Sequence, residues 1–172
     1  MVFTNSEEIV EVLRSLRVHG QGSNKYDNVR IGINARLDAI QAAVLLGKLP
    51  RFEWELEQRQ VVAKRYDKAL AGVATVPAVR SYNRSSWAQY SIRVKDREAV
   101  QARLKDAGVP TAVFYPKPLH LQQAFGYLGY KKGDMPISEE VARDIVSLPM
   151  HPYMDEKTQS LVIAQVKAAL KS

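Results

Sequence analysis

Asn34 and Arg36 are the side chains of this sequence best suited to binding an anion. They follow Gly32 closely and precede an apolar pattern with helical spacing from Leu37 to Leu49. Backbone N–H groups at the start of a helix, together with a side-chain amide, favour a phosphate or a carboxylate. Arg36 could add a two-point contact to a carboxylate, and Gly32 would let the backbone approach a ligand closely. The structural alternative is that Asn34 caps the helix and Arg36 is a solvated first-turn residue.

The three histidines give weaker evidence of a functional site. His19, His120 and His151 are widely spaced and show no ligand pattern, so no metal site is expected. His120 follows a rigid segment that starts at Tyr115 and contains two prolines, which could direct the ring into a cleft. The alternative is a histidine packed in the interior or on a surface loop. The sequence also lacks cysteine, a Ser-centred nucleophile elbow and a Gly-x-x-x-x-Gly-Lys phosphate loop.

The composition is that of a globular domain without a membrane segment. The 172 residues are 46% hydrophobic and 25% charged, with no long apolar run and no signal peptide pattern, so a cytoplasmic protein is expected. The net charge of +7 could indicate a nucleic-acid binder. Because the basic residues are scattered and no aromatic-basic motif occurs, a small anionic substrate such as a nucleotide sugar explains the charge better.

The elements that must position Asn34 and Arg36 are helices on either side of them. Thr4 or Asn5 is predicted to cap a helix whose apolar residues, from Ile9 to Leu16, form one buried face. After the two polar residues, a pair of long helices is predicted within residues 37–72. The pair meets at Pro50, which permits a break, a kink or the first turn of a new helix.

Residues 73–172 predict a small α+β lobe. Trp87 to Val94 alternates as a half-buried strand does, and residues 111–115 and 146–148 are expected to be two further short strands, each ended by proline. The predicted fold is therefore α+β, a long helical pair followed by about three strands covered by helices. The helices of the lobe are expected to begin after three capping residues: Asp96, Ser138 and Asp155.

The stretch Gly32-Ile-Asn34-Ala-Arg36-Leu37, followed by Gln41-Ala-Ala43, resembles a known signature, Gly-x-Asn-x-Arg-[Leu/Met]-x-x-[apolar]-Gln-Ala-Ala. It belongs to the pyridoxal phosphate-dependent sugar aminotransferases of the DegT/DnrJ/StrS type, in the fold-type I aspartate aminotransferase superfamily. Five further segments resemble the same family in order along the chain: residues 16–20, 59–70, 87–90, 108–120 and 148–152.

The resemblance implies transfer of an amino group from glutamate to a keto nucleotide sugar, in bacterial surface polysaccharide (O-antigen) biosynthesis, by a homodimer. It implies that Asn34 contacts the cofactor phosphate of the other subunit and that Arg36, Tyr115 and His120 contact the substrate. The Arg36-Leu37-Asp38 form of the signature suggests a UDP-3-keto-N-acetyl-hexuronic acid, whose carboxylate would suit Arg36. Phe114 departs from the histidine that is common in the family at this position.

By the same resemblance the lysine that binds the cofactor lies in the family's amino-terminal domain. Only Val2-Phe-Thr-Asn5 resembles the strand that follows this lysine. Residues 1–36 are thus expected to be a remnant of the cofactor domain, residues 37–72 linking helices, and residues 73–172 the small domain. No catalytic residue is expected in the chain, and alone it is expected to be inactive. The alternatives are a noncatalytic dimerisation or interaction module derived from this fold, and a basic nucleic-acid binder.

Overall fold

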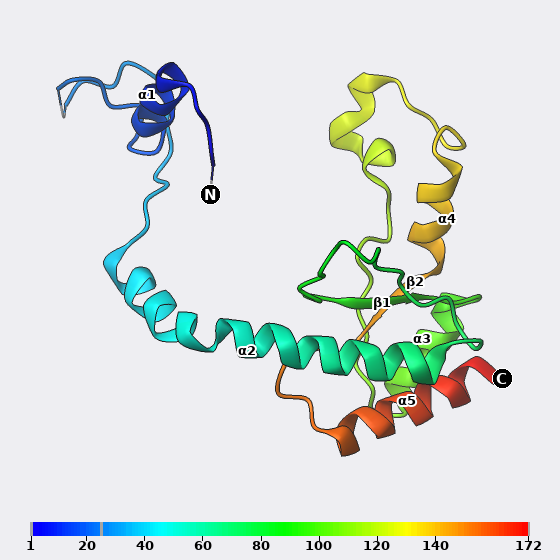
Figure 1. Cartoon of the computed structure of the whole chain (residues 1–172). Helices are drawn as coiled ribbons and strands as arrows, with labels where there is room; N and C mark the ends of the chain where they lie inside the picture. Colours follow the sequence, from blue (N-terminus) through cyan, green and yellow to red (C-terminus); the bar gives the residue numbers. More distant parts are fainter. Residues whose placement is uncertain (1, 25, 172) are drawn as a thin grey trace. The chain divides into compact units, whose positions relative to one another are not determined.

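A computed structural model describes residues 2–24 and 26–171, which form two compact units, Met1–Pro50 and Arg51–Ser172 (Figure 1). The α+β class predicted from the sequence is confirmed, and the expected three-part division of the chain stays a prediction. Along the chain the elements are α1 (Glu7–Leu16), α2 (Ala39–Leu70), β1 (Tyr90–Arg93), α3 (Arg97–Asp106), the 3₁₀ helices η1 (Leu119–Leu121) and η2 (Gln123–Leu128), α4 (Pro136–Asp144), β2 (Ile145–Leu148) and α5 (Glu156–Lys171).

The sheet has two strands rather than three. β1 and β2 pair antiparallel, with Tyr90 opposite Leu148, and the expected strand at 111–115 contributes only one bridge, between Ala112 and Ser147. Those two residues exchange both backbone hydrogen bonds, at 3.2 and 2.8 Å. The next hydrogen-bonded pair in that direction would join Pro110 to Pro149. Because neither proline has an N–H to donate, the ladder ends there.

The core of the second unit forms between the sheet and three helices, α2, α3 and α5. α3 packs against α5 and β2, and in Figure 1 α5 lies on one side of the strands and α4 on the other. Tyr66 of α2 donates its hydroxyl to the carbonyl oxygen of Pro149 at 2.9 Å, and Tyr90 donates to Oδ1 of Asp67 at 2.6 Å. The largest fully buried side chains are Tyr66, Tyr90, Leu70, Ile92, Leu104, Gln159, Val109, Val146 and Val166.

The expected helical pair is a single helix. α2 runs from Ala39 to Leu70 with Pro50 inside it, so the predicted two-helix arrangement is wrong. A proline removes only one backbone donor, and the residues on both sides of Pro50 are mostly strong helix formers, among them Leu49, Lys48 and Leu56. The boundary between the two compact units nevertheless falls at this proline.

Of the predicted caps in the second unit, one is confirmed. Asp155 accepts hydrogen bonds from the backbone N–H and the hydroxyl of Thr158, at 2.7 and 3.0 Å, and so caps α5. Asp96 precedes α3, but its side chain makes no capping bond. Ser138 lies inside α4, which begins with Pro136 because proline fits the first helical position.

The first unit differs from its prediction in two ways. Ser6, rather than Thr4 or Asn5, caps α1 by accepting from the N–H of Ile9 at 3.4 Å. The expected buried face of α1 is wrong, because Ile9 is exposed and Leu16 is only partly covered. This unit also exposes many large apolar side chains between residues 31 and 49: Ile31, Ile33, Leu37, Ile40, Val44, Leu45, Leu46 and Leu49.

Candidate functional site

Asn34 lies in an extended segment that pairs with the chain just after α1. It forms an antiparallel bridge with Val18, flanked by hydrogen bonds from the N–H of His19 to the carbonyl of Ile33 and from the N–H of Ala35 to the carbonyl of Arg17, both 3.0 Å. Since α2 begins only at Ala39, neither Asn34 nor Arg36 stands at a helix start. The predicted position of Asn34 and Arg36 at a helix start and the alternative of Asn34 as a helix cap are both wrong, whereas anion binding by the two residues stays a prediction.

Gly32 makes the close backbone approach that its residue type indicated, but to another part of the chain. A Cβ at Gly32 would lie 2.1 Å from the backbone nitrogen of Gly20. A Cβ at Gly20, whose φ is +76°, would lie 1.8 Å from the carbonyl oxygen of Arg30. Only glycine fits both positions. The two residues therefore let the chain after α1 and the segment before Asn34 cross closely, and this Gly20–Gly32 crossing holds Asn34 in place.

Asn34 and Arg36 contact each other directly. Nε of Arg36 donates to Oδ1 of Asn34 at 3.1 Å, and both side chains are exposed. The contact leaves the amide nitrogen of Asn34 and the two terminal nitrogens of Arg36 as further donors, and none of the three has a hydrogen-bond partner among the described residues. Adjacent amide and guanidinium donors of this kind fit phosphate or carboxylate oxygens. The residues present therefore fit an anionic group such as a cofactor phosphate.

Tyr115 lies on a groove in the second unit. The groove has a volume of about 390 Å³, and the Tyr115 side chain is mostly exposed at its edge. Its walls are largely apolar, with Lys117, Gln122 and Ser138 as polar members beside Tyr115, a composition typical of small-molecule sites. The lining residues are Tyr115, Lys117, Pro118, Leu119, Gln122, Ile137, Ser138, Val141, Ala142 and Ile145.

His120 is buried and does not line this groove. Its side chain is 4% exposed, and Nε2 lies 2.9 Å from Oε1 of Glu139 in α4. The hydrogen bond with His120, and then that from the backbone N–H of Gly133, hold the pKa of the Glu139 carboxyl below its ordinary value. The structure agrees with the alternative of a packed histidine, and direct contact of His120 with a substrate stays a prediction.

Glu139 is a residue that the sequence did not single out. It lies 19 positions from His120, in a helix whose charges look like a solvated face. No spacing rule joins a loop histidine to a helical carboxylate at that separation. Only the proline-rich approach to His120 indicated a fixed position for its ring, and the partner that fixes it comes from the fold.

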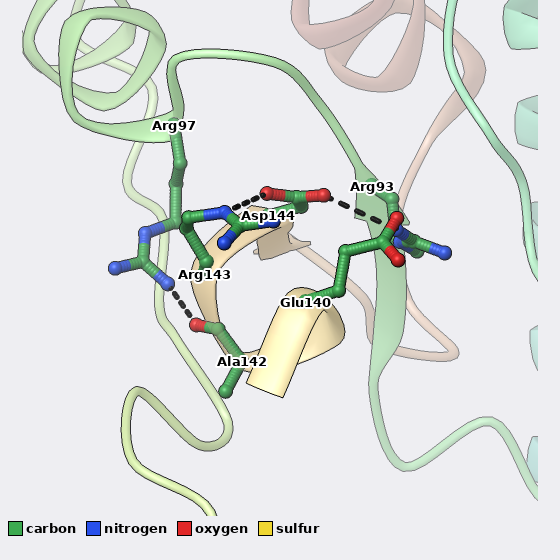
Figure 2. Close-up of polar contacts among 6 residues, drawn as sticks. All are labelled: Arg93, Arg97, Glu140, Ala142, Arg143 and Asp144. Carbon is green, nitrogen blue, oxygen red and sulfur yellow. Dashed lines mark hydrogen bonds and ion pairs between the residues drawn. The ribbon is translucent and has the colours of Figure 1, made fainter. Parts of the chain in front are cut away.

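The part of α4 that follows Glu139 is held by a network of charged groups (Figure 2). Arg93 of β1 contacts the carboxylates of Glu140 and Asp144, the latter at 3.1 Å. Arg97 donates to the carbonyl oxygen of Ala142 at 2.5 Å, in the last turn of the helix. A cation at a helix C-terminus is favourable, and Arg143 adds a contact to Asp144 at 3.3 Å. The network joins α4 to β1 and to the start of α3.

The four predicted site residues are thus divided between the two compact units. Asn34 and Arg36 belong to Met1–Pro50, whereas Tyr115 and His120 belong to Arg51–Ser172. Within the described ranges, 2–24 and 26–171, no three His, Asp or Glu side chains are grouped as metal ligands. Over the same residues, no helix has the length and apolar character needed to cross a membrane.

Comparison with known proteins identifies the family to which the chain is similar. Residues 1–167 match the DegT/DnrJ/EryC1/StrS aminotransferase family. The chain is 44% identical over 165 residues to the UDP-2-acetamido-2-deoxy-3-oxo-D-glucuronate aminotransferase of Pseudomonas aeruginosa, covering 95% of this chain and 45% of that protein.

Two solved structures are similar along almost the whole chain. One is a DegT DnrJ EryC1 StrS aminotransferase from Brucella abortus, with 48% identity, a TM-score of 0.85 and coverage of 96% of this chain and 44% of that one. The other is S. venezuelae DesV in complex with a ketimine intermediate, with 30% identity, a TM-score of 0.87 and coverage of 98% and 46%. The chain spans less than half the length of these proteins and corresponds to roughly their carboxyl-terminal part. Its similarity in sequence and in fold shows that this chain belongs to the DegT/DnrJ/EryC1/StrS family of aminotransferases.

Proposed function

We propose that this chain is the carboxyl-terminal part of a pyridoxal phosphate-dependent aminotransferase that aminates a UDP-3-keto-N-acetyl-hexuronic acid, with glutamate as amino donor. The observation that carries the proposal is the donor pair of Asn34 and Arg36, joined at 3.1 Å. The 44% identity to an aminotransferase of a 3-oxo-D-glucuronate nucleotide sugar supports the choice of an acidic sugar. A role in surface polysaccharide synthesis, a homodimer and a cytoplasmic location remain predictions from the family resemblance.

Asn34 is assigned to the phosphate group. Its Oδ1 accepts from Arg36, and its amide nitrogen, which is the donor of the side chain, is left to donate to a phosphate oxygen. Pyridoxal phosphate, when bound, supplies the electron sink that amino-group transfer requires. The amide itself positions the phosphate, and the Gly20–Gly32 crossing keeps the amide from moving away.

Arg36 and Tyr115 are assigned to the sugar. The terminal nitrogens of Arg36 suit an end-on, two-point contact with the C6 carboxylate of a hexuronic acid. Tyr115 offers a hydroxyl at the edge of the 390 Å³ groove, where it can donate to a sugar oxygen.

A second function, a noncatalytic interaction module, has one specific observation in its favour. The apolar side chains between residues 31 and 49 are exposed, with Ile31 at 99% and Ile40 at 82%. Exposed apolar patches of this kind mark surfaces that bind another protein. An interaction module would keep this surface and would have no need of the Asn34 and Arg36 donors.

A chimera distinguishes the two functions. Residues 1–167 would replace the matching part of the P. aeruginosa aminotransferase, with that parent enzyme as the positive control. The aminotransferase proposal predicts that the chimera retains pyridoxal phosphate after dialysis and aminates the UDP-3-keto hexuronic acid with glutamate. A chimera that is folded by circular dichroism, yet neither retains the cofactor nor turns over the sugar, would favour the interaction module.

A further inference from the structure

Glu139 joins three segments of the second unit through a single oxygen atom. Its Oε1 lies 2.9 Å from Nε2 of His120, which belongs to η1, and accepts the backbone N–H of Gly133 at 2.8 Å. Glu139 itself is anchored in the first turn of α4, where its N–H donates to the carbonyl of Met135 at 3.0 Å. The histidine and the carboxylate are 4% and 15% exposed, so water competes little for these bonds.

The pair lies next to the groove, and Glu139 belongs to the helix that forms one of its walls. Tyr115 is five residues before His120, and Pro116 and Pro118 restrict the chain between them. The far wall of the groove is formed by Ile137, Ser138, Val141 and Ala142, all of α4. α4 therefore supplies both the wall that faces Tyr115 and the carboxylate that holds the other end of the Tyr115 segment.

We propose that Glu139 is a positioning residue for Tyr115: by holding His120 and the Gly133 amide it sets the separation between the 115–121 segment and α4, and so the width of the groove. The assignment of the groove to a sugar rests on the proposed function, but the positional effect does not depend on catalysis. The Arg93 network holds the following part of α4, at Glu140 and Asp144 (Figure 2), and makes no contact with the 115–121 segment among the described residues.

The test places a fluorine label on Tyr115 in the full 172-residue chain and follows its ¹⁹F resonance. Glu139→Ala is expected to shift or broaden this resonance, because the buried histidine loses its partner. Glu139→Gln keeps an oxygen acceptor at the same place and is expected to leave the resonance at its wild-type position. His120→Ala is expected to reproduce the effect of Glu139→Ala.

Glu140→Ala is the matched control, since it removes a carboxylate from the neighbouring position of the same helix. An equal shift in Glu140→Ala and Glu139→Ala would overturn the proposal, because the effect would then belong to α4 in general. An unmoved resonance in a folded Glu139→Ala chain would also overturn the proposal, as would a Glu139→Gln resonance that departs from its wild-type position.

In the active chimera, Glu139→Ala should raise KM for the nucleotide sugar while kcat changes less, and Glu139→Gln should restore KM. If the chimera is inactive, the proposed function fails while the fluorine result still decides the role of Glu139.

Discussion

The backbones of Gly20 and Gly32 lie so close that a Cβ on Gly32 would come within 2.1 Å of the Gly20 nitrogen. Gly32→Ala is therefore expected to force the two segments apart, to lower the melting temperature of the chain and to displace Asn34. Faster amide hydrogen exchange at His19 and Ala35, whose N–H groups bridge the crossing, would report the displacement. Gly47→Ala, in α2 with no atom within 4 Å of the added Cβ, is the control and should be neutral or stabilising by up to about 1 kcal/mol.

Tyr66→Phe should destabilise the second unit at neutral pH. It removes the buried hydrogen bond to the Pro149 carbonyl, worth about 1 kcal/mol, which urea unfolding at pH 7 can measure. Burial raises the pKa of the Tyr66 hydroxyl well above its ordinary value of 10. The stability linked to that neutral hydroxyl is therefore present below pH 10 and is lost as the pH rises further. The difference in the free energy of unfolding between variant and wild type should then narrow at about pH 11. Tyr130→Phe, at a half-exposed tyrosine, should unfold like the wild type at both pH values.

Asp155→Ala should destabilise α5 near neutral pH and lose its effect in acid. Hydrogen bonds from the backbone N–H of Thr158, and then from its hydroxyl, lower the pKa of the Asp155 carboxyl. A lowered folded-state pKa means that the contribution is present above the ordinary carboxyl pKa, about 4, and disappears as the pH falls through the folded value. Melting curves at pH 7 and pH 2.5 would test this, with Asp106→Ala as an exposed control. A melting-temperature loss that is equal at both pH values would contradict the capping account.

The sequence was sufficient to predict the class of the fold and the position of most elements. The alternation of Tyr90 and Ile92, and the cap at Asp155, are local patterns that the structure retains. The sequence could not predict that residues 111–115 make a single bridge, because Pro110 and Pro149 end the ladder only in the register that pairs Ala112 with Ser147. Strand pairing of this kind is set by residues far apart in the chain.

The sequence indicated residues for the candidate site but not the geometry in which the structure holds them. Asn34 and Arg36 were indicated by their types and spacing, yet the helix expected to begin beside them starts only at Ala39. The pairing of Asn34 with Val18 depends on a turn of the chain after α1 that a helical period does not report. The role of Glu139 was likewise hidden, because its partner His120 comes from another segment.

The central claim is that Arg36 binds the carboxylate of an acidic nucleotide sugar while Asn34 holds the cofactor phosphate. The most direct measurement is the ratio of kcat/KM for the UDP-3-keto hexuronic acid to that for its 6-hydroxymethyl analogue, in the chimera with and without Arg36→Ala. A charge-assisted hydrogen bond is worth about 1.5–3 kcal/mol, so Arg36→Ala should lower this ratio by roughly tenfold or more. Asn34→Ala should instead mainly weaken cofactor retention and lower the ratio less than Arg36→Ala does, because Arg36 loses the hydrogen bond from its Nε but keeps its charge, and Arg14→Ala, on exposed α1, should change neither. If Arg36→Ala left the ratio at the wild-type value while the chimera remained active, the assignment of Arg36 to the carboxylate, and with it the acidic substrate, would be contradicted.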